Sequence, residues 1–505
     1  MRATRFETVR AVQQDVGVTI AGRVGARSAL GVVGVLAVVE FASGVLQGYY
    51  VPQLTDIARS LGIADADVNW LEGGQLAVSV VAVPILAKLG DLVGHRRVLL
   101  GALAVTAIAS LGLAFATASF PLFLALWAVQ GAYTVWLPLE IALIAHRSRD
   151  RPDPQATTRA GAGVVVAALE AGAIAGALAG GSAQGLLGSL RAALLLPGVL
   201  VLIAFLAVLL GVRKLPDSTA GTPLHGTGGS ERGTLDVRGA VLLGTALAVL
   251  TGALSLLRLQ PGSGIGWVVL VAGLALVAVF VFAERRIADP LVDMRVLARP
   301  AVWPVQLAAL LFGVSVLGAQ GPLSTFVRTD PAAVGYGLGL SSSLLSVVIG
   351  AYVLALLIGA LLLGPVSRRA GTRTTLVAGS AIVAVGYLAL LPFHGSLGEV
   401  LVAMAVAGLG SGTLVAALPA AAAAVAPAGR TAVATGLTNT GKSLGGAFAS
   451  CGFAIALAAG APAGGTAGSY AGYLTVWAVC GGTALVGALV LLVVPAAAFP
   501  GRAAA

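Results

Sequence analysis

A short charged turn, Ala87-Lys88-Leu89-Gly90-Asp91-Leu92-Val93-Gly94-His95-Arg96-Arg97, separates two long apolar stretches of the chain. The stretches cover roughly residues 69–87 and 98–117, and each is long enough to cross a bilayer as a helix. Gly94 permits a tight backbone turn. The pattern is therefore typical of two membrane helices joined by a charged loop at a membrane surface.

The composition of the whole chain extends this interpretation. The chain has 505 residues, of which 58% are hydrophobic and 10% are charged, whereas a soluble domain carries about 25% charged residues. Apolar runs of about 18 residues or more recur along its length, and the alternating strands of an outer-membrane barrel are absent. We therefore predict an all-α membrane protein with fourteen spans.

The basic residues predict the orientation of these spans. With both termini on one side, 25 of the 30 Lys and Arg residues fall in segments on that side. Arg59, Arg191, Arg258 and Arg328 fall on the other side, and Lys442 lies inside a span. Because basic loops stay in the cytoplasm, we expect a multi-pass protein of the cell membrane with both termini cytoplasmic. The net charge of +10 then reflects topology, and no nucleic-acid partner is expected.

Polar stretches divide the chain into six parts, in a 6 + 2 + 6 scheme of spans. The predicted parts are an amphipathic cytoplasmic tail (1–28), a six-helix bundle (29–212), a flexible linker (213–237), two additional helices with a charged inner loop (238–300), a second six-helix bundle (301–497) and a cytoplasmic tail (498–505). The turn at Asp91 has a weak counterpart in the second bundle, Gly364-Pro-Val-Ser-Arg-Arg-Ala-Gly-Thr-Arg. Internal duplication around a shared site is typical of transporters.

The turn at Asp91 resembles the inner-loop motif of the major facilitator superfamily, Gly-x-Leu-Ala-Asp-Arg-x-Gly-Arg-Arg, with Ala87, Leu92 and His95 as departures. The segment Glu284-Arg-Arg-Ile-Ala-Asp-Pro-Leu-Val-Asp and the segment Thr435-Gly-Leu-Thr-Asn-Thr-Gly-Lys-Ser resemble the fourteen-helix drug:proton antiporter branch. The resemblance covers nearly the whole chain. It implies a major facilitator fold of two six-helix bundles plus two extra central helices.

A carboxylate in such a turn can hold the opposite half of a transporter by charge-assisted hydrogen bonds and release it as the halves rock apart. We therefore predict a gating loop formed by Asp91, Gly94, Arg96 and Arg97. The alternative is a solvated loop that only sets the topology.

Acidic residues inside the predicted spans form a second set of candidates. Glu40 and Glu170 lie near the middle of a ~30 Å hydrocarbon core, Glu140 lies in the inner half of the fourth span, and Glu72 lies at the outer end of the second. Intramembrane acids are costly and usually functional, and a carboxyl group shielded from water can exchange protons near neutral pH. We predict that Glu40, Glu170 and Glu140 couple protons or bind substrate; structural hydrogen bonds between helices are the alternative.

A substrate cavity and a helix-packing motif complete the predicted site. Gln130, Tyr133 and Trp136 are candidates for the cavity, since aromatic rings beside a carboxylate suit bulky apolar cations or neutral aromatics. Tyr49, Tyr50 and Trp70 are instead expected mainly at the outer interface. The small-residue face Gly172, Gly176, Gly180 and Gly181 predicts close helix packing.

The resemblance also has gaps that bear on coupling. The family usually has Arg where this chain has Trp127, and Pro where it has Ala177. Coupling, if present, must therefore run through carboxylates, with Lys442 as a potential partner or as a side chain that snorkels to the inner face.

Three classes of function follow. The first is proton-coupled efflux of drug-like molecules or secondary metabolites, by a monomer that needs a small-molecule substrate, a lipid bilayer and a proton gradient but no cofactor or metal. The second is uptake of a small nutrient. The third, a membrane-embedded enzyme, is disfavoured because the four histidines fall in predicted loops and cannot pair as intramembrane haem ligands.

Overall fold

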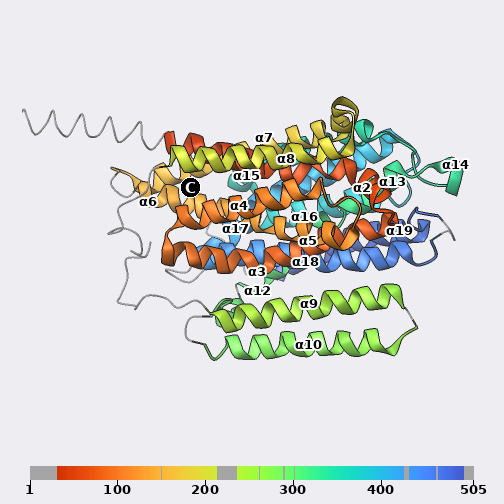
Figure 1. Cartoon of the computed structure of the whole chain (residues 1–505). Helices are drawn as coiled ribbons and strands as arrows, with labels where there is room; N and C mark the ends of the chain where they lie inside the picture. Colours follow the sequence, from red (N-terminus) through yellow and green to blue (C-terminus); the bar gives the residue numbers. More distant parts are fainter. Residues whose placement is uncertain are drawn as a thin grey trace, which may run out of the picture.

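The computed structural model describes residues 31–148, 151–212, 236–260, 262–287, 290–300, 302–425, 431–461 and 465–493. The predicted amphipathic tail, most of the predicted linker and the C-terminal tail lie outside the described residues. Within the described part, fourteen helices are long and apolar enough to cross a membrane. They run side by side along one direction (Figure 1), so the predicted all-α fold with fourteen spans is confirmed.

The first bundle contains six spans, the first of which begins at Gly31. After the helical residues 31–49, its elements are η1 (Val51–Gln53), α2 (Leu54–Leu61), η2 (Asp65–Val68), α3 (Asn69–Val93), α4 (His95–Leu113), α5 (Phe120–Gln130), η3 (Gly131–Val135), α6 (Trp136–Arg147), α7 (Pro154–Leu187) and α8 (Leu190–Gly211). The fourth span combines α5, η3 and α6. α7 is a single helix through Ala177, the position at which the family usually carries the kinking proline.

The second bundle repeats this plan. Its elements are α12 (Trp303–Phe312), η4 (Gly313–Leu317), α13 (Gln320–Arg328), α14 (Pro331–Val334), α15 (Ser342–Ala370), α16 (Thr372–Ala389), α17 (Leu397–Val425), α18 (Thr431–Ala458) and α19 (Tyr470–Val493). The first span of this bundle combines α12, a π-helical turn at η4 and α13. A π-helical turn inside a span is often found at a functional site.

The two bundles meet along two pairs of helices, α3 with α18 and α7 with α15. Small residues permit the close approach. A Cβ atom added to Gly73 of α3 would lie 2.8 Å from the Cys451 sulfur of α18, and one added to Gly181 of α7 would lie 2.1 Å from Ser346 Oγ of α15. Interfaces of this kind are typical of membrane helices, where close van der Waals packing replaces the hydrophobic effect.

The turns at Gly94 and Gly371 have the same backbone conformation and the same arginine contact in the two bundles. Gly94 and Gly371 have positive φ angles of 99° and 82° and separate consecutive spans. Two residues after each glycine, an arginine bonds to the C-terminal end of the last helix of its bundle. Arg96 donates to the Val212 and Leu209 carbonyls at 2.5 and 2.9 Å, and Arg373 donates to the Leu492 carbonyl. This repeat relates the two bundles by their internal bonding as well as by their sequence.

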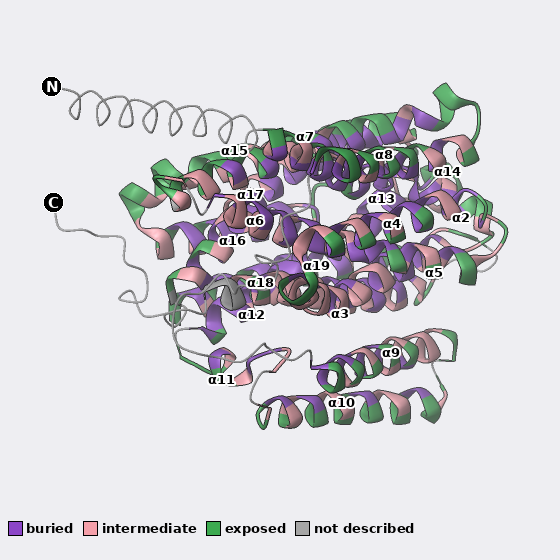
Figure 2. Ribbon diagram, turned by 60° about the vertical axis from the view of Figure 1, so that its left-hand side comes forward, coloured by how far each residue is buried: buried purple, intermediate pink, exposed green. Residues whose placement is uncertain are grey.

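The remaining two spans, α9 (Val237–Leu259) and α10 (Gly264–Glu284), lie outside the bundles, as both ribbon views show (Figure 2). A short helix, α11 (Met294–Leu297), follows them. α9 contacts α3 of one bundle and α18 of the other. α10 turns a row of large apolar side chains outward, as a lipid-facing helix does: Ile265, Trp267, Val268, Val271, Leu274, Val279 and Phe282.

The prediction that all histidines lie in loops is wrong for two of them. His95 is the first residue of α4, and His146 lies in the last turn of α6. Both stand at helix ends, and among the described residues no cluster of three or more potential metal ligands occurs.

Candidate translocation site

We call the end of the molecule that carries the turns at Gly94 and Gly371 the basic end, and the other the distal end. Within the part of the chain that the structure describes, five hydrogen bonds join the two bundles at the distal end. Their donors and acceptors are Ser324 Oγ to Val51 O (2.6 Å), Arg328 Nη2 to Asp56 Oδ1 (2.6 Å), Ser342 Oγ to Gly181 O (2.8 Å), Ser343 Oγ to Gly181 O (3.1 Å) and Asp65 N to Thr466 O (2.8 Å). We call this set the distal latch; it holds the bundles together at that end.

At the basic end, the predicted gating acid faces its own turn. Asp91 Oδ1 pairs with His95 Nε2 at 3.0 Å, and the Asp91 side chain is 65% exposed. Arg96 binds α8 within its own bundle, and Arg97 donates to the Val93 carbonyl at 3.2 Å. Among the described residues, therefore, Asp91 has no bond to the opposite bundle in this conformation, and its gating role stays a prediction for a conformation in which the basic end is closed.

Two acidic side chains lie buried together inside the first bundle. Glu40 of the first helix is 1% exposed and Glu140 of α6 is 0% exposed, and their charges interact. No oxygen of either carboxyl has a hydrogen-bond partner among the described residues. Ser43 lies close to Glu40 without the geometry of a hydrogen bond. Two like charges in a low-dielectric interior repel one another, so the pair is suited to hold a proton.

Aromatic side chains lie next to this pair on the fourth span, Trp136 at the start of α6 and Tyr133 on η3. Tyr133 lies close enough to Glu40 and Glu72 for electrostatic interaction with both carboxyl groups. The Tyr133 ring packs edge-on against the Trp136 ring, with the centroids 6.1 Å apart. Trp136 is fully buried, and its indole N–H has no acceptor among the described residues. The structure thus brings Tyr133 and Trp136 together beside the buried acids.

Gln130 belongs to a polar network inside the first bundle. Its Nε2 donates to Ser110 Oγ at 2.8 Å and to the Tyr50 hydroxyl at 3.3 Å, and its Oε1 accepts from Gln75 Nε2 at 3.5 Å. Gln130 is fully buried, so it links four helices rather than facing an open cavity in this conformation. Sequence reasoning did not find Ser110 and Gln75, because a single Ser or Gln in an apolar span is not distinctive.

Trp127 occupies the position where the family usually carries arginine. Its ring lies against Tyr50, with centroids 4.8 Å apart, and stacks on Phe123 at 5.9 Å. An aromatic cluster therefore fills the space that an arginine would need at this position.

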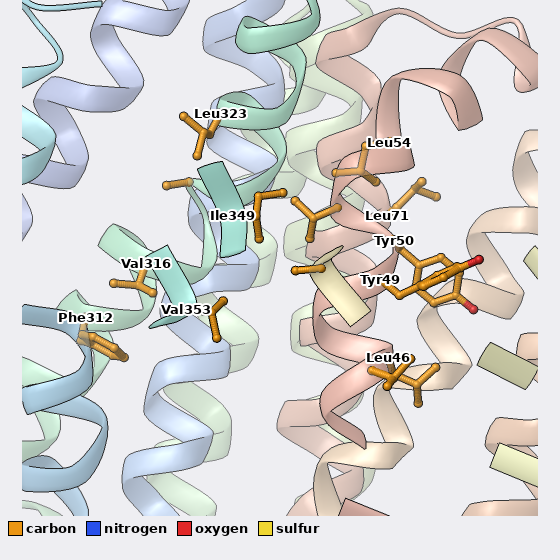
Figure 3. Packing of buried hydrophobic residues seen from close by; sticks show 14 of the residues in the cluster. Leu46, Tyr49, Tyr50, Leu54, Leu71, Phe312, Val316, Leu323, Ile349 and Val353 are labelled. Atoms are coloured by element: carbon orange, nitrogen blue, oxygen red, sulfur yellow. The ribbon is translucent and has the colours of Figure 1, made fainter. Parts of the chain in front are cut away.

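Tyr49, Tyr50 and Trp70 do not form the exposed aromatic belt that was expected of them, although they lie at the ends of their helices. All three are buried, and the Tyr49 hydroxyl donates to the Ala193 carbonyl of α8 at 2.8 Å. In Figure 3, the rings of Tyr49 and Tyr50 point away from the side on which Phe312 and Val316 of the second bundle lie. Their apolar area is used for packing within the first bundle.

The glycine face of α7 lies directly against the first helix. A Cβ atom at Gly172 would stand 2.1 Å from the Phe41 carbonyl oxygen, one at Gly176 2.8 Å from that of Val45, and one at Gly180 2.1 Å from that of Tyr49. The three acceptors follow one another at helical spacing, so the contact runs along both helices. Gly181 faces α15 instead and contributes to the distal latch through its carbonyl.

Glu170 lies apart from the other acids and faces the second bundle. It is half-buried on α7, and its carboxyl group interacts electrostatically with Lys442 of α18 and Tyr352 of α15. The structure therefore does not gather the three predicted carboxylates at one point. It gives a buried pair, Glu40 and Glu140, and a separate opposite-charge relationship between Glu170 and Lys442 across the two bundles.

Two related helical bundles joined at one end, one of them with buried acids in its interior, have the architecture of a membrane transporter. Residues 36–450 and 329–504 match the family model of the Major Facilitator Superfamily. The chain is 30% identical over 416 residues, 78% of each chain, to a protein described as the cephamycin export protein CmcT of Amycolatopsis lactamdurans. The chain belongs to the major facilitator superfamily.

Solved structures share the fold. The nucleoside transporter NupG matches with a TM-score of 0.59 and 14% identity over 91% of this chain and 99% of that one. An auto-inhibited POT family peptide transporter matches with a TM-score of 0.62 and 16% identity, over 92% and 96%. The human organic anion transporter MFSD10 matches with a TM-score of 0.56 and 17% identity, over 92% and 99%.

Proposed function

We propose that this protein exports small organic molecules, drug-like compounds or secondary metabolites, in exchange for protons. The relative named for cephamycin export supports the direction and the class of cargo. The proposal places the protein in the cell membrane as a monomer, with the basic end in the cytoplasm. It needs no bound cofactor, because the proton gradient supplies the driving force.

The observation that carries the proposal is the pair Glu40 and Glu140. Both carboxyl groups are buried, neither has a hydrogen-bond partner among the described residues, and their charges interact. Burying two bare charges without partners is strongly unfavourable. A proton on the pair removes one charge, and its release to water in another conformation links proton movement to the rocking of the bundles.

The distal latch describes one half of the proposed cycle. With the basic end in the cytoplasm, the structure is closed toward the outside, and substrate enters from the inside. Opening to the outside requires the latch to separate and the basic end to close, and Asp91 is the group that then engages the second bundle. The Glu170–Lys442 relationship lies across the bundles, so its strength changes with their separation.

Transport into inverted membrane vesicles tests the proposal. An imposed gradient, acidic inside, should drive accumulation of dyes or antibiotics, and collapse of the gradient should abolish it. Glu40→Gln and Glu140→Gln should each reduce accumulation to the level of vesicles that lack the protein. Glu399→Gln is the matched control, since Glu399 is an exposed acid that caps the turn at Gly395.

Accumulation that survives collapse of the gradient would reject proton coupling. If a nutrient instead enters intact cells and no substrate accumulates in inverted vesicles, the result would favour uptake as the function.

A further inference from the structure

Two acids outside the bundles form a second buried pair. Asp236 lies directly before α9, and Glu284 is the last residue of α10. Glu284 is 1% exposed and Asp236 is 8% exposed. They lie at the basic end beside the segment 290–297, separate from Glu40 and Glu140.

One oxygen of each acid has a backbone donor. Glu284 Oε2 accepts from the Val292 N–H at 2.8 Å, and Asp236 Oδ1 accepts from the Gly239 N–H at 2.8 Å. The other oxygens, Glu284 Oε1 and Asp236 Oδ2, are buried and have no partner among the described residues.

These two oxygens face the same point. A Cβ atom added to Gly239 would lie 2.2 Å from Glu284 Oε1 and 2.4 Å from Asp236 Oδ2. Both oxygens are acceptors when the acids are ionised, so nothing donates between them. Two buried acceptors that converge on one point favour a proton or a cation between them.

The charged groups around the pair do not supply that bridge. Within the described residues, no Lys, Arg or His lies at ion-pair distance from either acid. The charged residues of the adjoining elements are Arg238 and Arg258 on α9, Arg285 and Arg286 after α10, Asp293, Arg295 and Arg299 around α11, Glu72, Lys88 and Asp91 on α3, and Lys442 on α18; Glu72 lies at the opposite end of α3. Several have other contacts: Arg258 pairs with Asp67, Arg286 lies over the Phe282 ring, and Arg295 donates to the Arg285 carbonyl.

We propose that Asp236 and Glu284 form a proton-binding site, in which one proton is shared between Glu284 Oε1 and Asp236 Oδ2. The proton converts one acid into a donor and the other into its acceptor. It thereby ties the start of α9, the end of α10 and the segment at Val292 to one another.

The tied elements rest on both bundles. Val292 packs with Val80 of α3, Leu243 and Leu247 of α9 and Phe280 of α10 in a small apolar cluster, against which Leu444 and Phe448 of α18 also pack. Since α3 and α18 belong to different bundles, the shared proton holds α9 and α10 in place at the contact between the two bundles. This inference does not depend on what the protein transports.

Infrared difference spectroscopy on the purified full chain tests the shared proton. The wild type at neutral pH should show the band of a protonated carboxyl group, and Asp236→Asn and Glu284→Gln should each lose the signal of one carboxyl proton per protein. Gly239→Ala keeps both acids but separates them, and it should lose the same signal. Glu399→Gln, which changes an exposed acid, should keep it.

Thermal unfolding against pH gives an independent result. Wild-type stability should fall as rising pH removes the proton and leaves two facing carboxylates. Asp236→Asn, which supplies a permanent amide donor, should lose less stability over the same range.

Two outcomes would overturn the proposal. The first is an unchanged carboxyl signal in both amide variants. The second is wild-type stability that depends on the concentration of Na⁺ or K⁺ at constant ionic strength, with no carboxyl signal, because a cation would then bridge the oxygens.

Discussion

Arg328 Nη2 donates to Asp56 Oδ1 at 2.6 Å, and this ion pair joins α13 of the second bundle to α2 of the first. The two side chains are 19% and 23% exposed, so solvent screens the pair only in part. The bond belongs to the distal latch and exists in the conformation that is closed at that end. A charge substitution at Asp56 or Arg328 should therefore change the population of the conformation that is closed at the distal end.

Loss of this pair should shift the protein toward opening at the distal end. We expect Asp56→Asn to weaken the closed state by about 1 kcal/mol, roughly a fivefold change in population. Spin labels at Ser60 and Ala333, exposed positions on α2 and α14, would report a larger share of long distances. The exchanged pair, Asp56→Arg with Arg328→Asp, should restore the wild-type distribution of distances. An unchanged distribution in Asp56→Asn would show that this ion pair does not hold the distal end closed.

Asp91→Asn should act on the opposite conformation. Because Asp91 pairs with His95 of its own turn and has no bond to the described part of the second bundle, the substitution should leave expression and the distances in the distally closed state unchanged. Transport should nevertheless fall, since the state closed at the basic end loses a charge-assisted contact. Substrate flux and the distance between the spin labels at Ser60 and Ala333, measured on the same variant, test this prediction. Full transport by Asp91→Asn would show that the turn only sets topology.

The glycine face of α7 offers a matched pair of substitutions. Gly180→Ala places a methyl group 2.1 Å from the Tyr49 carbonyl oxygen, and we expect it to destabilise the protein by about 1–3 kcal/mol. Gly185→Ala lies on the same helix with open space around its Cβ position, and it should be neutral or stabilise by up to about 1 kcal/mol. Thermal unfolding in detergent distinguishes them, and equal melting temperatures would argue against close packing of α7 on the first helix.

Arg96 should hold the C-terminal end of α8. Arg96→Ala removes two donors from the Leu209 and Val212 carbonyls, which lie at the C-terminal end of α8, where a helix runs out of intrahelical donors. Hydrogen exchange of the last turn of α8 should accelerate roughly fivefold, equivalent to about 1 kcal/mol. Arg96→Lys keeps the charge but not the two-pronged geometry, so it should restore only part of the protection. Unchanged exchange in Arg96→Ala would mean that the contact adds no stability.

Local sequence patterns were sufficient to predict the spans, because length and apolarity act within each helix. The all-α fold with fourteen spans follows from them, and the contact of Gly172, Gly176 and Gly180 with the first helix agrees with the expected role of a small-residue face. The pairing of Glu40 with Glu140 could not be predicted, because it depends on how two apolar helices are rotated about their axes. Hydropathy carries no information on that rotation when a helix is apolar on all sides.

Other parts of the site depend on tertiary context or conformation. Trp127 and Tyr50 form an aromatic cluster only when the first span and α5 meet, so the exposed interface role expected for Tyr50 could not be corrected from the sequence. The separation of Asp91 from the second bundle belongs to one conformation of the protein, which no single turn encodes. The sequence carried one usable signal for Asp236, its place directly before an apolar span, where Asp caps a helix.

Substrate-driven proton movement tests the central claim most directly. The wild-type protein, reconstituted in vesicles that contain a pH-sensitive dye, should change the internal pH when substrate is added, in proportion to the amount transported. The variant with both Glu40→Gln and Glu140→Gln should exchange labelled substrate across the membrane without any change in pH. A pH change as large as that of the wild type in this double variant would contradict the assignment of proton coupling to the buried pair.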